Sequence, residues 1–177
     1  MYLEEIRLKF IQPCTTGGSK IKIRADLSSD ISEIFPYLNS YIKSAMYNKK
    51  AQTVTFKIEQ KIVTLFNREV AITKLLNETD AYETMDYVRK IINETYENKE
   101  NIVPSDEMKK LPSPIEIYKN LPKLNCKRCG EMTCIAFASK LLSGEKSIQC
   151  CRPLYEDVNI DKLEKLEVSI LLLGYEI

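Results

Sequence analysis

Short stretches of alternating apolar and polar residues dominate the first hundred positions. Ile6, Leu8 and Phe10 alternate with polar neighbours, a pattern typical of a half-buried strand. Turn-forming residues follow at 13–19, and the period of two then resumes, which predicts a hairpin. The predicted strands are residues 6–10, 21–27, 54–58 and 62–65, with a turn at 59–61 and, at 69–75, either a fifth strand or the lead-in to a helix.

Two other stretches repeat their apolar residues at helical spacing. The first face is Ile31, Ile34, Phe35, Leu38, Ile42, Ala45 and Met46, and the second is Ala81, Met85, Val88, Ile92 and Tyr96. Asp30 with Glu33, and Asp80 with Glu83, fit capping boxes at the two starts. Pro36 removes one helical hydrogen bond, so the first helix either kinks there or begins its regular part near that residue.

This order of elements predicts an α+β fold. We expect a small antiparallel sheet with two helices on one side, followed by a small helical module that carries four cysteines. The expected parts are residues 1–97 as a partner-binding or scaffold domain, 98–120 as an exposed linker, 121–154 as the cysteine module and 155–177 as a C-terminal helix or strand. Within the linker, residues 115–121 fit one helical turn that ends at Pro122.

Composition narrows the possible functions. The net charge of +1 points to neither nucleic acid nor an acidic substrate, and 44% hydrophobic residues is ordinary for a protein with a core. The charged N-terminus lacks the apolar region of a signal peptide, and the apolar run at 170–173 is too short to span a bilayer. We therefore expect a cytoplasmic protein, without a membrane partner, whose thiols stay reduced.

Three cysteines lie within nine residues, and a fourth follows about one helix later. Cys126, Cys129, Cys134 and Cys151 have the spacing C-x2-C-x4-C-x16-C, and Gly130 allows a tight turn beside the first pair. The sequence contains no histidine, so sulfur must hold any metal at this place. Cys150 is adjacent to Cys151, so spacing leaves the fourth position open between them.

A helix is predicted directly after the first three cysteines. Thr133 can cap a helix over residues 134–143, with Gly144 as its C-terminal stop. Cys134 would lie in the first turn, where the helix dipole favours a thiolate. Residues 121–154 carry six basic and two acidic side chains, a net charge of +4 that offsets negative charge on a cluster and would suit an acidic redox partner.

Residues 121–154 closely resemble the iron–sulfur domain of the corrinoid iron–sulfur protein large subunit. The matching residues are Leu121-Pro122-Lys123-Leu124-Asn125-Cys126, Cys129-Gly130-Glu131, Thr133-Cys134, Ala136-Phe137-Ala138, Lys140-Leu141, Gly144-Glu145 and Cys151-x-Pro153-Leu154. A similar domain occurs in the cluster-bearing subunit of an ion-translocating, ferredoxin-oxidising complex of anaerobes. The layout of the whole chain also resembles small iron–sulfur proteins of anaerobes.

The resemblance implies a [4Fe-4S] cluster on Cys126, Cys129, Cys134 and Cys151. Cys151 is implied as the fourth ligand because Cys151-Arg152-Pro153-Leu154 fits the register of the family. It further implies one-electron transfer to a low-potential partner such as a corrinoid protein, rather than catalysis by this chain. The alternatives are a protein-binding module whose metal site is structural or redox-sensing, and a four-cysteine zinc site, although zinc sites usually pair two C-x2-C knuckles.

Two other features have simpler interpretations than a functional site. Cys14, in Pro-Cys-Thr-Thr-Gly-Gly, is expected to belong to a hairpin loop rather than to act as a reactive thiol. The apolar ladder Leu163, Leu166, Ile170, Leu173 and Ile177 is expected to pack on its own chain, because two heptads are short for a coiled coil.

Overall fold

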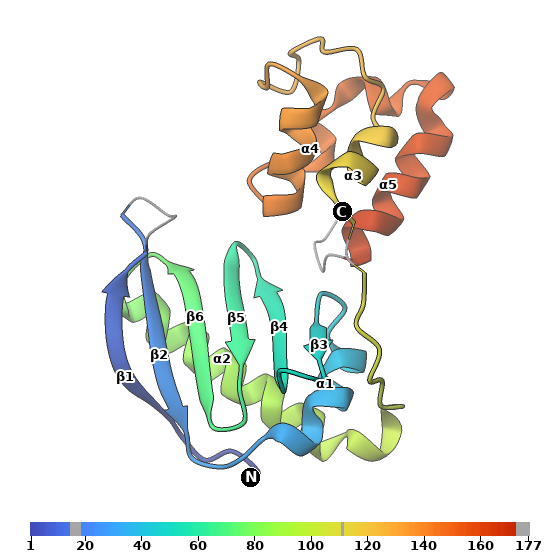
Figure 1. Ribbon diagram of the computed structural model, residues 1–177. Helices are drawn as coiled ribbons and strands as arrows, with labels where there is room; N and C mark the ends of the chain where they lie inside the picture. Colours follow the sequence, from blue (N-terminus) through green and yellow to red (C-terminus); the bar gives the residue numbers. More distant parts are fainter. Residues whose placement is uncertain (15–18, 111, 173–177) are drawn as a thin grey trace. The chain divides into compact units, whose positions relative to one another are not determined.

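The protein folds into two compact units, Met1–Lys109 and Lys110–Ile177 (Figure 1). A computed structural model describes residues 1–14, 19–110 and 112–172, with side chains through residue 170. The first unit contains the sheet and two helices, and the second is helical. The predicted α+β fold class is therefore confirmed.

Six strands form one antiparallel sheet in the first unit. Their order across the sheet is β1-β2-β6-β5-β4-β3, so the strands β3 to β6 form a meander and β2 joins it beside β6. The strands are β1 (Ile6–Pro13), β2 (Ile21–Leu27), β3 (Met46–Asn48), β4 (Thr53–Ile58), β5 (Lys61–Leu65) and β6 (Glu69–Leu75). Of the two interpretations of residues 69–75, the strand is the one observed.

Apolar side chains from one face of the sheet form the core with two helices, α1 (Phe35–Tyr41) and α2 (Glu78–Glu97). In β2, the buried residues Ile23, Ala25 and Leu27 alternate with exposed ones, which leaves the other face of this strand to solvent. Figure 1 shows α2 running along the sheet. The helices contribute Phe35 and Leu38 from α1, and Ala81, Met85, Val88 and Ile92 from α2.

A β-bulge in β1 corrects the predicted alternation of that strand. Leu8 pairs with the buried Ala25, but the register shifts before Phe10, which pairs with Arg24 on the solvent face. Phe10 is consequently 40% exposed instead of half-buried with Ile6 and Leu8. One extra residue in a bulged strand reverses which face the following side chains occupy.

The first helix is shorter than its apolar pattern predicts. A 3-10 turn (Ser32–Ile34) precedes α1, which begins at Phe35 with Pro36 in its first turn, where no hydrogen bond is lost. Beginning near Pro36 was one of the two predicted outcomes. The helix ends at Tyr41, and Met46 belongs to strand β3, so the predicted extension of the helix through Met46 is wrong.

Neither predicted capping box forms. The Asp30 carboxylate accepts the Ser32 N–H at 2.9 Å and thus supports the 3-10 turn instead of α1. The second helix begins earlier than predicted, because the Asn77 side chain caps it by accepting the Asp80 N–H at 2.9 Å. Asp80 lies within the first turn of α2 and accepts the Leu76 N–H at 2.8 Å.

The segment after α2 is bonded to α1. A short 3-10 turn (Lys99–Asn101) leads into it. The buried Asn39 donates to the carbonyl oxygens of Ser105 and Glu107 at 3.0 and 2.9 Å. The Lys109 ammonium donates to the carbonyl oxygens of Asn39 and Ile42 at the C-terminal end of α1, where a cation complements the helix dipole. Residues through Lys109 therefore belong to the first unit.

The second unit contains α3 (Pro114–Lys119), α4 (Cys134–Ser143) and α5 (Ile160–Leu172), with 3-10 turns at Ile148–Cys150, Arg152–Tyr155 and Asp157–Asn159. Of the C-terminal ladder, Leu166 and Ile170 are buried in the core of this unit, as expected for packing on its own chain. Leu173 and Ile177 lie outside the described residues. The helix, rather than the strand, is the form that residues 160–172 adopt.

Candidate metal centre

Helix α4 fixes the position of Cys134. The Thr133 hydroxyl caps the helix by accepting the Ala136 N–H at 3.2 Å, and Gly144 ends it with a φ of 74°. Both ends are where the sequence predicts them. Cys134 is consequently the first residue of α4, with its thiol near the positive end of the helix dipole.

The loop before α4 carries the first two cysteines without any helix or strand, from residue 121 to 133. Asn125 and Lys127, on either side of Cys126, have φ values of 47° and 60°, in the left-handed region. Gly130 has a φ of 85° and donates its N–H to the Lys127 carbonyl at 2.9 Å, which closes the turn around Cys129. Left-handed backbone is unfavourable for residues other than glycine, so the surrounding contacts must hold this loop.

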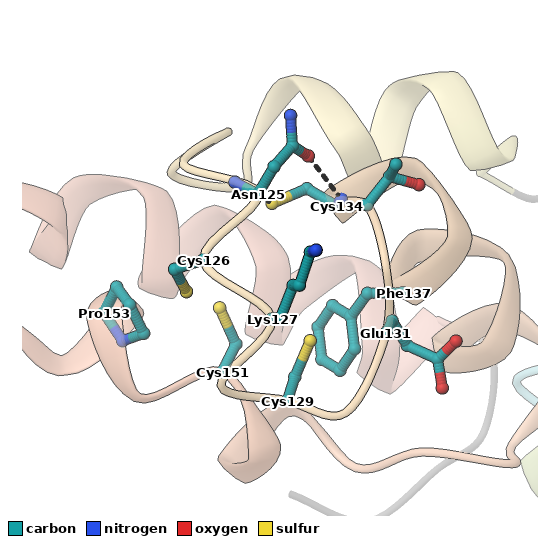
Figure 2. A pocket seen from close by; sticks show the side chains of 10 residues that line it. Asn125, Cys126, Lys127, Cys129, Glu131, Cys134, Phe137, Cys151 and Pro153 are labelled. Carbon is teal, nitrogen blue, oxygen red and sulfur yellow. Dashed lines mark hydrogen bonds between the residues drawn. The ribbon is translucent and has the colours of Figure 1, made fainter.

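The four predicted ligand residues line one pocket (Figure 2). Its lining includes Cys126 and Cys129 from the loop, Cys134 from α4 and Cys151 from between two 3-10 turns. Cys150 is partly buried but is not among the lining residues. Asn125, Lys127, Glu131, Thr133, Phe137 and Pro153 complete the lining.

The pocket becomes more buried from its loop side to its core side. Cys126 is exposed and Cys129 is intermediate, whereas Cys134 and Cys151 are buried within the core of the second unit. Burial raises the pKa of the Cys151 thiol to about 11. The neighbouring Cys129 raises this pKa further, whereas the hydrogen bond from the Leu154 N–H lowers it. Thiolates collected this closely repel one another, and a bound cationic centre relieves that repulsion.

Asn125 connects the loop to the first turn of α4. Its side-chain oxygen accepts the Cys134 N–H at 2.8 Å, and its own N–H donates to Cys134 Sγ at 3.4 Å. Figure 2 shows the first of these bonds, between the Asn125 side-chain oxygen and the Cys134 N–H. These two bonds hold Asn125, which directly precedes Cys126, against Cys134.

A second contact holds the other side of the loop. Glu131 is only 11% exposed in its side chain and forms ion pairs with Lys140 at 3.0 Å and Lys146 at 3.9 Å. Lys146 also donates to the Cys129 carbonyl at 3.2 Å. The loop is thus bonded to α4 and to the segment that follows it.

The thiol pocket fits the donor set that an iron–sulfur cluster requires. It offers four sulfur ligands and, in a chain without histidine, no competing imidazole. Within residues 1–14, 19–110 and 112–172, no group of three or more His, Cys, Asp or Glu side chains is arranged to hold a single metal ion.

Residues 121–153 match the family model described as "Putative Fe-S cluster". This segment is therefore similar to iron–sulfur cluster domains. The match spans the loop, α4 and the turn that carries Cys151, and therefore contains all four cysteines that line the pocket.

The chain is similar to short segments of larger proteins. The acetyl-CoA decarbonylase/synthase complex subunit gamma of Methanosarcina acetivorans is 47% identical over 72 residues, which cover 37% of this chain and 15% of that protein. The corrinoid/iron-sulfur protein large subunit of Moorella thermoacetica is 48% identical over 50 residues, 28% of this chain and 11% of that protein. The chain thus spans about a seventh or less of the curated relatives, and the iron–sulfur domain is related to parts of these subunits. No solved structure matches.

Asn125, Glu131 and Lys146 acquire roles that the sequence pattern does not indicate. An asparagine before a C-x2-C pair has no fixed meaning, and a salt bridge between residues 131 and 146 depends on how the chain folds back.

Cys14 is buried in the first unit, where its N–H donates to the Lys20 carbonyl at 2.8 Å, as in the expected hairpin. Of the helices in the described ranges, none has the length and apolar composition that crossing a bilayer requires.

Proposed function

We propose that Cys126, Cys129, Cys134 and Cys151 hold a [4Fe-4S] cluster and that the protein transfers single electrons to a low-potential partner. The observation that carries this proposal is the single pocket lined by these four thiols inside a segment related to iron–sulfur domains. Cys150 lies outside the pocket lining, which supports Cys151 as the fourth ligand.

A cluster with four cysteine ligands suits electron transfer better than catalysis. Each iron atom at such a site is already bound by one thiolate, so no position is open for a substrate. When bound, the cluster supplies a one-electron redox couple. The chain's residues hold it: the loop and α4 position the thiols, and Phe137 and Pro153 supply apolar surface to the pocket.

A corrinoid protein is the partner that the relatives favour. One relative is named as a corrinoid/iron-sulfur protein subunit, and another as a subunit of a complex that decarbonylates or synthesises acetyl-CoA. We infer that this chain supplies electrons to such a protein in the reducing cytoplasm, where its thiols stay available for iron. Transfer of an electron to restore an inactive cobalt centre is the role that this assignment suggests.

A structural or redox-sensing centre is the second candidate. It is favoured by the loop at 121–133, which has no helix or strand and contains several left-handed residues. Ligation by Cys126 and Cys129 would connect this loop to the core, as structural metal sites do. In that case the first unit would bind a partner protein, and the centre would report on oxidation or only maintain the fold.

Anaerobic purification followed by iron, sulfide and zinc analysis tests the proposal. About four iron and four acid-labile sulfide per chain, with an EPR signal after dithionite reduction, are expected. Reduction and reoxidation with unchanged circular dichroism would support electron transfer, whereas unfolding of the second unit on reduction would support the structural role. Stoichiometric zinc without sulfide would contradict both iron–sulfur assignments.

A further inference from the structure

We infer that the rim of the thiol pocket is a docking surface for a redox protein that presents acidic side chains around its own redox centre. The inference rests on the proposed electron-transfer function and adds the surface and the class of partner. We define the rim by five of the exposed residues that line the pocket or directly adjoin residues that do, namely the long basic or apolar side chains Leu124, Lys127, Arg128, Met132 and Arg152.

The rim also contains two large apolar side chains that are exposed to solvent. Leu124 is 60% exposed and adjoins Asn125, and Met132 is 68% exposed between Glu131 and Thr133. Two large apolar side chains beside a cluster pocket provide the water-excluding contact that protein interfaces use at their centres. Methionine in particular adapts its shape to a partner.

The basic part of the rim has no ion pairs. Among the described residues, Lys127, Arg128 and Arg152 form no salt bridge, although all three are exposed. By contrast, Lys140 and Lys146 are paired with Glu131. The unneutralised positive charge of the module is therefore concentrated around the pocket opening.

This charge remains positive when the cluster is bound. Residues 121–154 carry six basic and two acidic side chains, so their difference is +4. A cluster with four thiolates contributes two negative charges when oxidised and three when reduced, which leaves the segment positive in both states. An acidic partner would be attracted to the rim, and a basic one repelled.

The electron would leave the cluster on the side of Cys126. It is the exposed member of the four pocket cysteines, and Cys134 and Cys151 face the core. Iron bound to Cys126 would be the nearest cluster edge to a docked protein. In the transfer, the reduced cluster loses one electron and the partner's metal gains it, and no bond or proton is exchanged.

Stopped-flow oxidation of the reduced protein tests the surface with two proteins of opposite charge. The acceptors are plastocyanin, which is acidic, and cytochrome c, which is basic, and each takes one electron. The double variant Arg128→Glu/Arg152→Glu should lower the rate constant with plastocyanin about tenfold at low salt and raise that with cytochrome c. The matched control is Lys119→Glu/Lys165→Glu, which reverses two exposed charges elsewhere in the second unit and should change either rate less than twofold.

An apolar variant makes an independent test. Leu124→Ser should lower the rate constant of electron transfer to plastocyanin at high salt as well as at low salt. Val168→Ser, at a position of similar exposure on α5, should not change this rate constant. Each variant is first checked for iron content and EPR spectrum. If the glutamate variant loses iron, Arg128→Gln/Arg152→Gln replaces it, with a smaller decrease expected.

Three results would overturn the inference. Rim and control variants that change the rates equally would exclude a localised surface. Self-association that the rim variant abolishes, with unchanged plastocyanin rates, would assign the rim to a second copy of the chain. A parent protein without a reducible cluster would overturn the proposed function as well, and the iron and EPR measurements detect that failure before any rates are compared.

Discussion

The amide of Asn125 and the first residue of α4, Cys134, are joined by two hydrogen bonds that run in opposite directions. Asn125 Oδ1 accepts the Cys134 N–H at 2.8 Å, and the Asn125 N–H donates to Cys134 Sγ at 3.4 Å. Asn125 thus satisfies a free N–H at the helix start and places a donor on a proposed ligand sulfur. The bonds also hold Asn125 in its left-handed conformation, with a φ of 47°.

Asn125→Ala should loosen the proposed cluster without unfolding the module. Loss of a side-chain oxygen that accepts a helix N–H costs about 1 kcal/mol, so the loop should open more often. We expect the variant to lose iron several-fold faster to a chelator under anaerobic conditions. Asn125→Asp keeps an acceptor and should recover most of the retention, and Ser139→Ala, on an exposed position of α4, is the control. Unchanged iron loss in Asn125→Ala would show that the clamp is not needed.

The adjacent cysteines should respond differently to substitution. Because Cys151 lines the pocket and Cys150 does not, Cys151→Ala should lower iron content sharply and change the EPR spectrum, whereas Cys150→Ala should leave both near the parent values. Cys126→Ala, Cys129→Ala and Cys134→Ala should resemble Cys151→Ala. Full iron occupancy in Cys151→Ala together with loss in Cys150→Ala would reverse the assignment of the fourth ligand.

Glu131→Gln should destabilise the loop through its two lysines. The change removes the charge that pairs with Lys140 and Lys146, and Lys146 also holds the Cys129 carbonyl. Since the lysines are partly exposed, we expect a loss of about 1 kcal/mol in the free energy of unfolding. Anaerobic urea denaturation, followed by cluster absorbance, measures it. Glu145→Gln changes an exposed carboxylate nearby and should have less effect; an equal effect would show that net charge, rather than the contact, matters.

Asp80→Asn should reduce the stability of the first unit at neutral pH and much less in acid. Burial disfavours the Asp80 carboxylate, but the Leu76 N–H and Lys61 more than offset it and lower the pKa of Asp80. A lowered pKa stabilises the folded state above the unfolded value of about 3.9, and that contribution disappears as pH falls through the folded pKa.

The Lys61 and Asp80 side chains are mostly buried and 2.8 Å apart, so we expect a loss of about 1–2 kcal/mol at pH 7. Hydrogen–deuterium exchange of α2 peptides at pH 7 and pH 3 measures this loss in the first unit alone. Asp86→Asn, at an exposed position of the same helix, is the control. Equal destabilisation by Asp80→Asn at both pH values would contradict the role of ionised Asp80.

Local helix signals predict both ends of α4, although the two capping boxes predicted from Asp30 and Asp80 do not form. Thr133 and Gly144 bound α4 as predicted, because a hydroxyl cap and a left-handed glycine act within one turn of the chain. Alternation likewise predicts most of the sheet. Alternation fails at Phe10, where a bulge that depends on pairing with β2 reverses the face. Helical spacing fails at Met46, which lies in β3 and pairs with Thr55 of β4.

By itself, the sequence determined the α+β class, the first three thiols of the pocket (Cys126, Cys129 and Cys134) and the helix that presents Cys134, because spacing, caps and periodicity are properties of neighbouring residues. Only the tertiary structure decided which of Cys150 and Cys151 reaches the pocket lining, and that Asn125 and Lys146 hold the loop. Lys146 contacts the Cys129 carbonyl across 17 positions. Such contacts depend on how the chain returns after α4, and local propensity does not specify that path.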